Sequence, residues 1–346
     1  MHTSIHTFSL TLHWKLIGLI SQIDRFDASW TTIEKREGQS LKQLKSIATV
    51  RSVGASTRIE GSQLSDKQVE ILLKNIDITR LQDRDTQEVV GYFNVLDFIS
   101  ENFSDINIKQ NDLKHLHHML LQHSSKDDWH RGEYKQMSNA VEARMPDGSR
   151  QVIFQTTEPG FATRDAMQSL VDWYNTDDQI HPLVKCAVFC YEFVTIHPFQ
   201  DGNGRLSRLL ATLLLLKAGY KWIEYVSFEH EIESRKAEYY RVLRSSQANR
   251  PGEDVTGWVV FFFDALDHIQ RQLMDKLHTQ GVEATLSPRD KAILTFISNN
   301  PGCKSGRISE ELGYPAPTVK RTLTELVTKN LLAKHGIGPG TNYTIK

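Results

Sequence analysis

Long stretches of the chain place apolar residues three or four positions apart, which is the spacing that one face of an α-helix requires. From about Arg84 to Leu277, such stretches follow one another closely and predict a series of helices. These helices are expected over Glu88–Phe103, Lys109–His123, Arg164–Asn175, Leu183–Thr195, Asn203–Ala218, Glu231–Ala248 and Asp254–His278. Residues 1–85 also have helical spacing, with polar interruptions. The pattern therefore predicts a mainly α-helical protein.

One short segment in the middle of the chain interrupts the helical pattern. The tripeptide Pro146-Asp147-Gly148 stands between two short apolar stretches, Val141–Ala143 and Val152–Phe154. Proline presets φ at the start of a turn, and glycine adopts the positive φ that many tight turns require. We therefore expect a small β-hairpin over Ala140–Glu158, carried by the helical domain.

The C-terminal part has a pattern of its own. Residues 280–287 have the composition of a linker. After them, the pattern predicts helices over Pro288–Asn299, Ser305–Leu312 and Pro317–Asn330, then a β-ribbon from Leu331–His335 and Tyr343–Ile345 around the turn Gly338–Gly340. Three helices followed by a ribbon are typical of a winged helix-turn-helix. Three regions are thus expected, 1–85, 86–278 and 279–346.

Composition narrows the class of protein. The chain has 346 residues, of which 39% are hydrophobic and 24% charged, as in a soluble globular protein. Its net charge of −1 gives no overall attraction to nucleic acid or to a membrane surface. The N-terminus lacks the pattern of a signal peptide, and no apolar run is long enough to span a bilayer. We therefore expect a cytoplasmic protein without membrane contact.

The three cysteines do not suggest a disulfide framework. Cys186 and Cys190 lie four residues apart on an apolar helical stretch, where buried thiols are the ordinary interpretation. A group of histidines, His115, His117, His118 and His123, lacks a carboxylate at the spacing of a metal site. Neither group predicts a metal centre.

The densest group of reactive side chains lies between the two most apolar predicted helices. It reads His197-Pro198-Phe199-Gln200-Asp201-Gly202-Asn203-Gly204-Arg205-Leu206-Ser207-Arg208. Pro198 disfavours helix for the residue before it, so the first helix ends near His197 and the second begins near Asn203. A helix N-terminus presents free N–H groups and the positive end of the helix dipole. This run therefore has the properties of a phosphate-binding site.

Individual residues of the run supply different chemistry. His197 has an ordinary pKa near neutrality and can accept a proton from a hydroxyl group. Asp201 is a hard oxygen ligand of the kind that Mg²⁺ prefers. Gly202 lets the backbone approach an anion closely. Arg205 and Arg208, three residues apart, project from neighbouring positions near the start of the helix, and their planar groups suit phosphate oxygens.

Each of these elements alone is common in ordinary turns and on solvated helix faces. Their combination in this order, at a helix start, favours a nucleotide site. The sequence contains no G-x-x-x-x-G-K-[ST] motif, so a Walker-type site is not expected.

The run HPFQDGNGRLSR resembles, without departure, the HPFx[D/E]GNGRxxR signature of Fic domains, and the resemblance extends over roughly Arg84–Leu277. It implies a Fic-type helical bundle with a β-hairpin flap, and transfer of AMP from ATP to a protein hydroxyl group. By this resemblance His197 is the catalytic base that deprotonates a Ser, Thr or Tyr of the target. Asp201 holds Mg²⁺ on the α- and β-phosphates, and pyrophosphate leaves.

The resemblance also implies a set of binding residues. The amides of Gly202–Gly204 form an anion hole, Asn203 helps to orient the α-phosphate, and Arg205 and Arg208 hold the outer phosphates. The expected ATP-binding residues are Gly202, Asn203, Gly204, Arg205, Leu206, Ser207, Arg208, Tyr239 and Tyr240, with Gln247 near them. The flap strand, made of Val152, Ile153, Phe154 and Gln155, is expected to pair with the target peptide by strand addition.

A second motif lies near the N-terminus. The residues Ser56-Thr57-Arg58-Ile59-Glu60-Gly61 resemble the inhibitory motif [S/T]xxxE[G/N] of Fic proteins. Taken alone, the segment also fits a helix that ends at Gly61 with a solvated Glu60. With the Fic-type run in the same chain, we expect Glu60 to pair with Arg208 and to hold the enzyme inactive. Whether Glu60 also supports removal of AMP from a target stays open.

The partners of the winged helix are less well defined. From Ser287 to Lys346 there are nine Lys and Arg residues against four Asp and Glu residues, and Lys320 and Arg321 lie on the expected recognition helix. Contact with DNA and contact with a protein both remain open. A homodimer is expected because two-fold dimers are the commonest oligomers. The alternative function is a nucleotide-sensing regulator that acts through the winged helix.

Overall fold

The computed structural model describes residues 8–77, 81, 83–144, 150–284 and 286–346. The chain divides into two compact units, Met1–Arg271 (unit 1) and Gln272–Lys346 (unit 2). The mainly helical fold that the sequence predicts, with a C-terminal winged helix, is confirmed. The turn expected at Pro146-Asp147-Gly148 lies outside the described residues.

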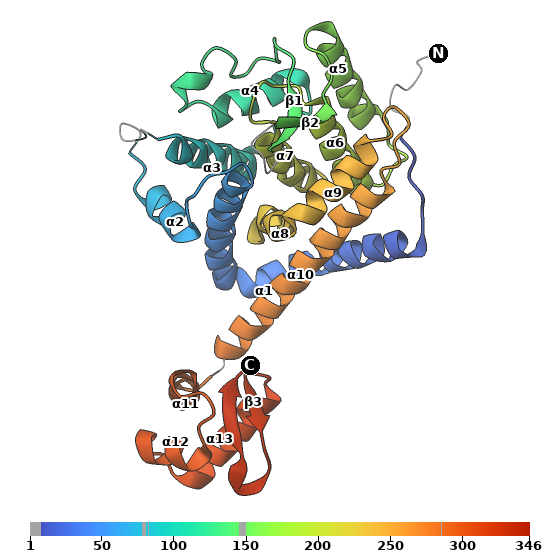
Figure 1. Ribbon diagram of the computed structural model, residues 1–346. Helices are drawn as coiled ribbons and strands as arrows, with labels where there is room; N and C mark the ends of the chain where they lie inside the picture. The colour runs from blue at the N-terminus through green and yellow to red at the C-terminus, as the bar shows by residue number, and fades with distance from the viewer. Residues whose placement is uncertain (1–7, 78–80, 82, 145–149, 285) are drawn as a thin grey trace. The chain divides into compact units, whose positions relative to one another are not determined.

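Unit 1 is a helical bundle that carries a two-stranded hairpin (Figure 1). Its helices are α1 (Trp14–Ile59), α2 (Asp66–Lys74), α3 (Arg84–Asn102), α4 (Gln110–Leu120), α5 (Phe161–Thr176), α6 (Pro182–Ile196), α7 (Asn203–Lys217), α8 (Phe228–Ser234) and α9 (Lys236–Gln247). Short 3₁₀ helices are η2 (Ser125–Asp127) and η3 (Lys221–Tyr225). The long helix α10 (Thr256–Ala284) begins in unit 1 and ends in unit 2.

Helices α6 and α7 pack against each other at the centre of unit 1, and almost every residue of both is buried. Pro182 at the start of α6 needs no hydrogen-bond partner for its nitrogen, and the His181 side chain accepts from the Leu183 N–H. Helix α7 ends before Gly219, whose φ of +100° suits glycine. The loop between these two helices, residues 197–202, is therefore held by two buried elements.

Helix α1 connects distant parts of unit 1. Its buried apolar positions, among them Leu16, Leu19 and Ile23, recur at helical spacing, and α1 packs against α3, α8 and η3. In Figure 1 the α1 ribbon runs along the lower edge of the unit and then turns upward beside α3. The helix ends at Ile59, where Gly61 adopts a φ of +115°. This path brings Glu60 to the start of α7.

The hairpin consists of β1 (Ala140–Arg144) and β2 (Arg150–Gln155), which pair in antiparallel fashion. Ala140 lies opposite Gln155, and the register shifts between Val141 and Glu142. Within the described residues, β1 and β2 form a sheet of two strands. The outer edge of each strand is thus available for backbone hydrogen bonds to a further strand.

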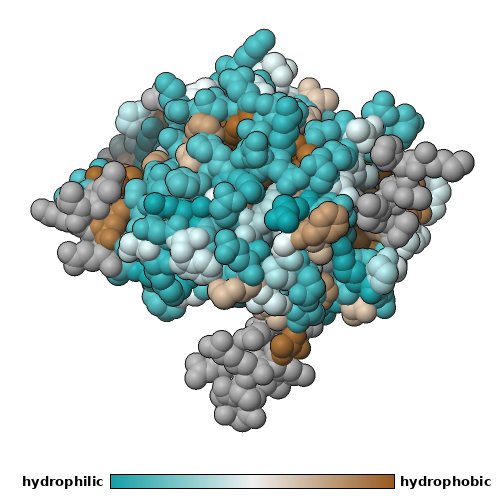
Figure 2. Space-filling view, turned by 90° about the horizontal axis from the view of Figure 1, so that it is seen from above, coloured by the Kyte–Doolittle hydropathy of each residue, from teal (hydrophilic) through white to brown (hydrophobic). Residues whose placement is uncertain are grey.

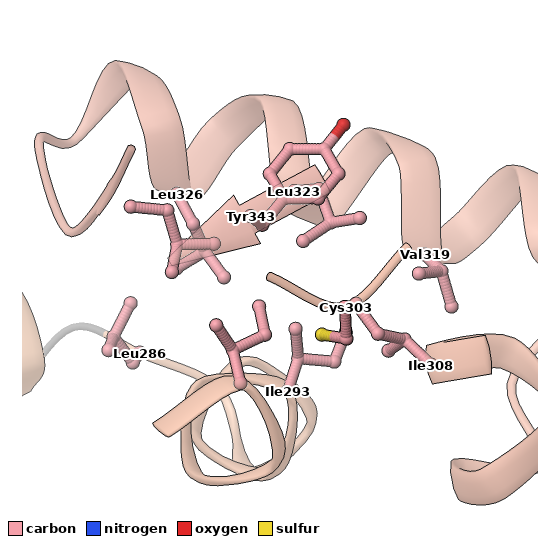
Figure 3. Packing of buried hydrophobic residues seen from close by; sticks show 10 residues of the cluster. Leu286, Ile293, Cys303, Ile308, Val319, Leu323, Leu326 and Tyr343 are labelled. Carbon is pink, nitrogen blue, oxygen red and sulfur yellow. The ribbon is translucent and has the colours of Figure 1, made fainter. Parts of the chain in front are cut away.

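Unit 2 is a small domain with its own hydrophobic core. It contains α11 (Pro288–Asn299), α12 (Ser305–Leu312), α13 (Ala316–Thr328), β3 (Leu332–His335), η4 (Gly338–Gly340) and β4 (Asn342–Ile345). Ile293, Ile308, Leu323 and Tyr343 come from three helices and the last strand, and their side chains point toward one another (Figure 3). Strands β3 and β4 pair antiparallel and form the ribbon. Three helices closed by a ribbon make a winged helix.

Two boundaries that we expected from the sequence are wrong. Residues 280–284 belong to α10 rather than to a linker, because a single glycine in a helix-compatible stretch does not end a helix. The helix expected over Glu231–Ala248 is two helices, α8 and α9, separated at Arg235. The Ser234 hydroxyl donates to the Glu231 carbonyl at 2.8 Å, and such a local bond competes with the helical ladder.

The face shown in Figure 2 is covered mostly by hydrophilic residues, with hydrophobic ones in small separate groups. Within the part of the chain that the structure describes, we find no helix with both the length and the hydrophobicity that crossing a bilayer requires.

Gly91 on α3 provides a test of this packing. A Cβ atom at Gly91 would lie 2.1 Å from the carbonyl oxygen of Leu120 at the end of α4. We expect Gly91→Ala to lower the free energy of unfolding by about 1–3 kcal/mol, because the backbones of α3 and α4 must separate. Gly18→Ala is the matched control, since a Cβ atom at this position of α1 would meet nothing within 4 Å. The control is expected to be about 0.5–1 kcal/mol more stable than wild type in urea denaturation. Equal effects of both changes would contradict this account.

Candidate active site

The loop that joins α6 to α7 begins at His197. This residue ends α6 with a φ of +54°, and its N–H donates to the Phe193 carbonyl at 3.0 Å. The imidazole Nδ1 lies 3.2 Å from the Val194 carbonyl oxygen and can only donate there, which leaves Nε2 as the acceptor. Burial lowers the pKa of His197 below its ordinary value, although the Val194 bond opposes this. The side chain is thus held as a neutral imidazole that can accept a proton.

Phe199 fixes this loop to the core. Its side chain is fully buried and stacks on His117, with ring centroids 3.8 Å apart and planes 6° apart. The Asn203 side chain binds both polar groups of Phe199, accepting from its N–H at 2.9 Å and donating to its carbonyl at 2.7 Å. The conformation of the loop is therefore set by the stack of Phe199 on His117 and by the two hydrogen bonds of the Asn203 side chain. The amide of Asn203 serves the loop in this structure, and its expected role toward the α-phosphate stays a prediction.

His117 is a member of this site that sequence analysis missed. It is fully buried, its Nδ1 accepts from the Gly132 N–H at 2.9 Å, and its Nε2 donates to the Asp201 carbonyl at 2.9 Å. Burial is the main reason that its pKa falls to about 4. The alternation of buried and exposed positions on α4 could have marked His117 as internal, but not as a support of Asp201.

Asp201 is the carboxylate of this loop. Its oxygens accept from the Gly202 N–H at 2.6 Å and from Arg84 at 2.9 Å, and Arg205 lies 3.3 Å away. Burial opposes ionisation, but Arg205, the Gly202 N–H and Arg84 outweigh it and hold the pKa of Asp201 below its ordinary value. The side chain remains 38% exposed, so an ionised oxygen is accessible from the pocket.

This donor set fits magnesium that arrives with a nucleotide. Among the described residues, no group of three or more His, Cys, Asp or Glu side chains could hold a metal ion alone. Mg²⁺ is commonly bound by one or two carboxylates together with substrate phosphates. Asp201 can supply the carboxylate if Arg84 gives up its contact.

The start of α7 combines free amides with two arginines. Gly202 has a φ of +79°, and the first N–H groups of the helix have no partner within it. Arg205 is almost completely buried, 3.2 Å from Glu88. In the part of the chain that the structure describes, its buried Nε atom has no hydrogen-bond acceptor, and its Nη1 atom meets Glu88 at ion-pair distance. Glu88 and Asp201 thus balance the charge of Arg205, which lines the pocket described below.

Arg208 is bound by the end of α1. Its Nε donates to the Ser56 hydroxyl at 2.8 Å, and its Nη2 donates to the Ser56 carbonyl at 3.0 Å and to Glu60 at 2.7 Å. Burial opposes the charge on Glu60, but Arg208 outweighs it and holds the pKa of Glu60 below its ordinary value. Gly204 permits this approach, because a Cβ there would lie 2.4 Å from Glu60 Oε1. The sequence-based expectation that these two residues meet agrees with this geometry.

A group of contacts that the sequence did not indicate holds the end of α1 in place. Arg58 donates to both oxygens of Glu233 on α8, at 2.7 and 2.9 Å, and lies 2.9 Å from Asp66 on α2. Lys236 on α9 donates to the Ile59 carbonyl at 2.7 Å. We call these contacts the Arg58 clamp. They fix the two residues that directly precede Glu60, which carries the carboxylate.

A pocket of about 180 Å³ opens over these groups. It is lined by Glu60, Phe154, Val194, His197, Gln200, Asp201, Gly202, Asn203, Gly204, Arg205, Arg208, Tyr239, Tyr240, Leu243, Arg244 and Gln247. Tyr240, Leu243, Arg244 and Gln247 follow helical spacing along α9 and form its wall. We expected the tyrosines and Gln247 here, but missed Leu243 and Arg244, which that spacing could have revealed.

Two residues expected to bind ATP do not line this pocket. Leu206 is fully buried, and the Ser207 hydroxyl donates to the Cys190 carbonyl on α6 at 3.3 Å. The helical period turns the Ser207 hydroxyl toward α6, whereas Arg205 and Arg208 line the cavity. Membership of the sequence run is therefore a poor guide to contact at these two positions.

Among the hairpin side chains that the structure describes, that of Phe154 reaches the pocket. Phe154 lines it, whereas Val152 is 53% exposed and Gln155 donates to the Ser138 hydroxyl at 3.1 Å. The side chain of Ile153 lies outside the described residues. The expected flap strand is thus beside the site, with Phe154 facing inward.

Comparison with known proteins agrees with this geometry. Residues 107–215 match the model of the Fic/DOC family, and residues 284–337 match that of the MarR family. The chain is 25% identical to Protein adenylyltransferase Fic of Drosophila willistoni over 254 residues, 72% of this chain and 46% of that protein. It is 29% identical to the protein of the same name in Culex quinquefasciatus over 187 residues, 52% and 34% of the two chains. The chain spans less than half the length of these curated relatives.

Solved structures show the same fold. A Fic family protein from Desulfovibrio desulfuricans is 24% identical, with a TM-score of 0.64 and 97% of both chains covered. Fic-1 from C. elegans is 22% identical, with a TM-score of 0.57, covering 77% of this chain and 72% of that chain.

His117 should make the stability of the protein dependent on pH. Its pKa is about 4 in the folded protein against an ordinary 6.5, so between these values the unfolded chain binds more protons. Stability is therefore complete above about pH 6.5 and falls by about 3 kcal/mol as the pH drops toward 4. We expect His117→Phe, which keeps the ring stack but cannot titrate, to flatten this slope in urea denaturation from pH 4 to 7. The exposed His115→Gln on the same helix is the control. An unchanged slope for His117→Phe would contradict the assignment.

Proposed function

We propose that this protein is a protein adenylyltransferase that transfers AMP from ATP to a hydroxyl group of a target protein, because residues 107–215 match the Fic/DOC family and residues 284–337 match the MarR family. The observation that carries this proposal is the single pocket in which a neutral imidazole, an ionised carboxylate, free helix amides and two arginines meet. Transfer of a nucleotidyl group requires a general base, a metal ligand and hydrogen-bond donors to the phosphate oxygens.

In the proposed reaction, Nε2 of His197 accepts the proton of a Ser, Thr or Tyr hydroxyl group of the target. The hydroxyl oxygen bonds to the α-phosphorus of ATP, the bond from that phosphorus to the bridging oxygen breaks, and pyrophosphate leaves with the electron pair. The amides at the start of α7 stabilise charge on the α-phosphate, and Arg205 binds the outer phosphates. Bound Mg²⁺, held by Asp201, would withdraw charge from the phosphate oxygens. Tyr239 and Tyr240 line the expected nucleoside pocket.

The hairpin supports the proposed recognition of the target. Strand β2 has a free outer edge within the described residues, beside the pocket that contains His197. A target segment that adds to this edge would bring a hydroxyl side chain toward the imidazole through backbone hydrogen bonds. Such pairing reads little of the target's side-chain sequence, so the identity of the target is not encoded here.

The proposed enzyme is self-inhibited in its resting state. Arg208 already donates from Nε and Nη2 to Ser56 and Glu60, so these donors are not free to bind the γ-phosphate. ATP that binds beside Glu60 would have its α-phosphate displaced from the line of attack, and a displacement of about 1 Å costs on the order of 10²-fold in rate. A second role of Glu60, in removing AMP from a target, stays a prediction, as does a homodimer.

Glu60→Gly is expected to raise AMP incorporation on the order of 10²-fold, because it frees Arg208 for the γ-phosphate. The measurement is transfer of α-labelled AMP, with Mg²⁺, onto the protein itself and onto proteins of a lysate. In the Glu60→Gly background, His197→Ala should abolish the label while ATP binding by calorimetry stays close to that of its parent.

Glu70→Gly is the matched control, since this glutamate lies on α2 and pairs with Lys74 in solvent. Labelling of Glu60→Gly no stronger than that of wild type would sink the inhibitory role. Labelling that survives His197→Ala would sink the proposed base.

A second candidate function is binding of DNA by the winged helix. Lys320 and Arg321 are exposed on α13, the position of a recognition helix, and unit 2 matches the MarR family. The alternative function, a nucleotide-sensing regulator, would couple such binding to the pocket of unit 1. Protein contact through the same surface is the competing interpretation.

A gel shift of the full chain with mixed-sequence duplex DNA tests this candidate. We expect a shift at low salt that weakens steeply as salt rises, because phosphate contacts release counterions. Lys320→Ala with Arg321→Ala should weaken it on the order of ten-fold or more, whereas Lys291→Ala on α11 should change it little. The absence of any shift at low salt would favour a protein-contact role.

A further inference from the structure

Lys135 is a buried lysine that the proposed reaction does not use. Only 2% of its surface is exposed, and it lies between η2 and β1, outside the His197–Arg208 run. A buried ammonium group is costly unless its three donors find acceptors. The burial of this residue beside the site therefore requires an explanation.

All three donors of Lys135 are satisfied by neutral oxygens. The Nζ atom donates to Asn139 Oδ1 at 2.9 Å, to Thr156 Oγ1 at 2.7 Å and to the Ile196 carbonyl at 3.3 Å. The backbone N–H of Lys135 donates to the Pro198 carbonyl at 2.9 Å. Lys135 thus binds the residues on both sides of His197.

The other two acceptors are the ends of the hairpin. Asn139 directly precedes β1, and Thr156 directly follows β2. The Thr156 hydroxyl lies 2.6 Å from the Asn139 carbonyl, and Asn139 Nδ2 donates to the Phe199 carbonyl at 2.9 Å. One ammonium group therefore joins both ends of the strand pair to the loop that carries the base.

The charge of Lys135 also acts on the imidazole. It favours the neutral form of His197, whereas the carboxylates of Glu60 on α1 and Asp201 in the loop favour the protonated form. The remaining charged or titratable groups around the same pocket are Arg205, Arg208, Tyr239, Tyr240 and Arg244. Burial lowers the pKa of Lys135 to about 8, so the group is still largely charged at neutral pH. A neutral imidazole is the form that a base requires.

We propose that Lys135 is a positioning residue for His197, which fastens the base to the ends of the hairpin and keeps its imidazole unprotonated. This inference rests on the proposed function for its catalytic meaning. Its physical content, a lysine that sets the position and the protonation of a histidine, does not depend on the identity of the substrate. A target strand that pairs with β2 would then be linked to His197 through the hydrogen bonds of Thr156 and Lys135.

The first test needs no nucleotide. Histidine side chains labelled with ¹³C are titrated by NMR in the full-length protein, and the His197 signal is assigned by its loss in His197→Gln. We expect the midpoint of His197 to move to higher pH in Lys135→Met, which keeps the length of the side chain but removes its charge. Lys185→Met is the matched control, because this lysine is on α6 and binds the Asp177 carbonyl. In this control the His197 midpoint should equal that of wild type.

The second test measures the pH profile of kcat/KM for AMP transfer in the Glu60→Gly background. Lys135→Met should lower kcat/KM on the order of 10-fold or more near neutrality and move the acid limb to higher pH. Thr156→Val removes one acceptor but leaves the charge, so it should lower the rate without moving the limb. This variant also keeps the test informative if Lys135→Met does not fold.

The two tests separate the inference from the proposed function. A midpoint of His197 that is identical in wild type and Lys135→Met overturns the inference, whatever happens to the rate, because a merely structural lysine would slow the reaction without moving the midpoint. A moved midpoint in a protein that transfers no AMP from any nucleotide would instead contradict the proposed function.

Discussion

The burial of Phe199 is the constraint on which the whole site depends. A loop with a positive-φ histidine, a proline and a glycine has many accessible conformations, and a single one is selected because the Phe199 ring fills the space beside His117. The Asn203 amide then closes the loop from the first turn of α7. Once this ring is in place, His197, Asp201 and the amides of α7 have little freedom. The chemistry is thus set by a hydrophobic contact that no substrate touches.

The two arginines of the site are neutralised in different ways. Arg205 is balanced by Glu88 and Asp201 at ion-pair distances of 3.2 and 3.3 Å. Arg208 instead donates from Nε and Nη2 to Ser56 and Glu60 in direct hydrogen bonds. The charge of one arginine is therefore balanced by two carboxylates at ion-pair distance, while the other is held by hydrogen bonds to the end of α1. The difference comes from geometry, since both residues belong to the same helix turn and the same sequence run.

The fold was largely predictable because it follows from local signals. Helical spacing, the proline of α6 and the glycine after α7 mark elements by interactions within a few residues. The supports of the site were not predictable in this way. His117 lies 84 positions from Asp201, and Lys135 lies 61 positions from Ile196, so each contact exists only after the chain has folded. Leu206 and Ser207 show that a sequence motif can also predict too many site residues, because a continuous motif on a helix includes positions that face the core.

The Arg58 clamp has a consequence for how an inhibitory carboxylate acts. The Glu60 carboxylate would compete with a phosphate group for Arg208. Because Glu60 is part of the same chain, this competition depends on its effective concentration at Arg208, which rises as the end of α1 is held more rigidly. Two ion pairs and a lysine–carbonyl bond confine it here, all of them outside the pocket. Weakening any of these contacts would lower the effective concentration of the Glu60 carboxylate at Arg208, while the carboxylate itself stays the same. In the proposed autoinhibition, the degree of inhibition would thus be a graded quantity, adjustable from helices α2, α8 and α9, rather than a switch with two positions.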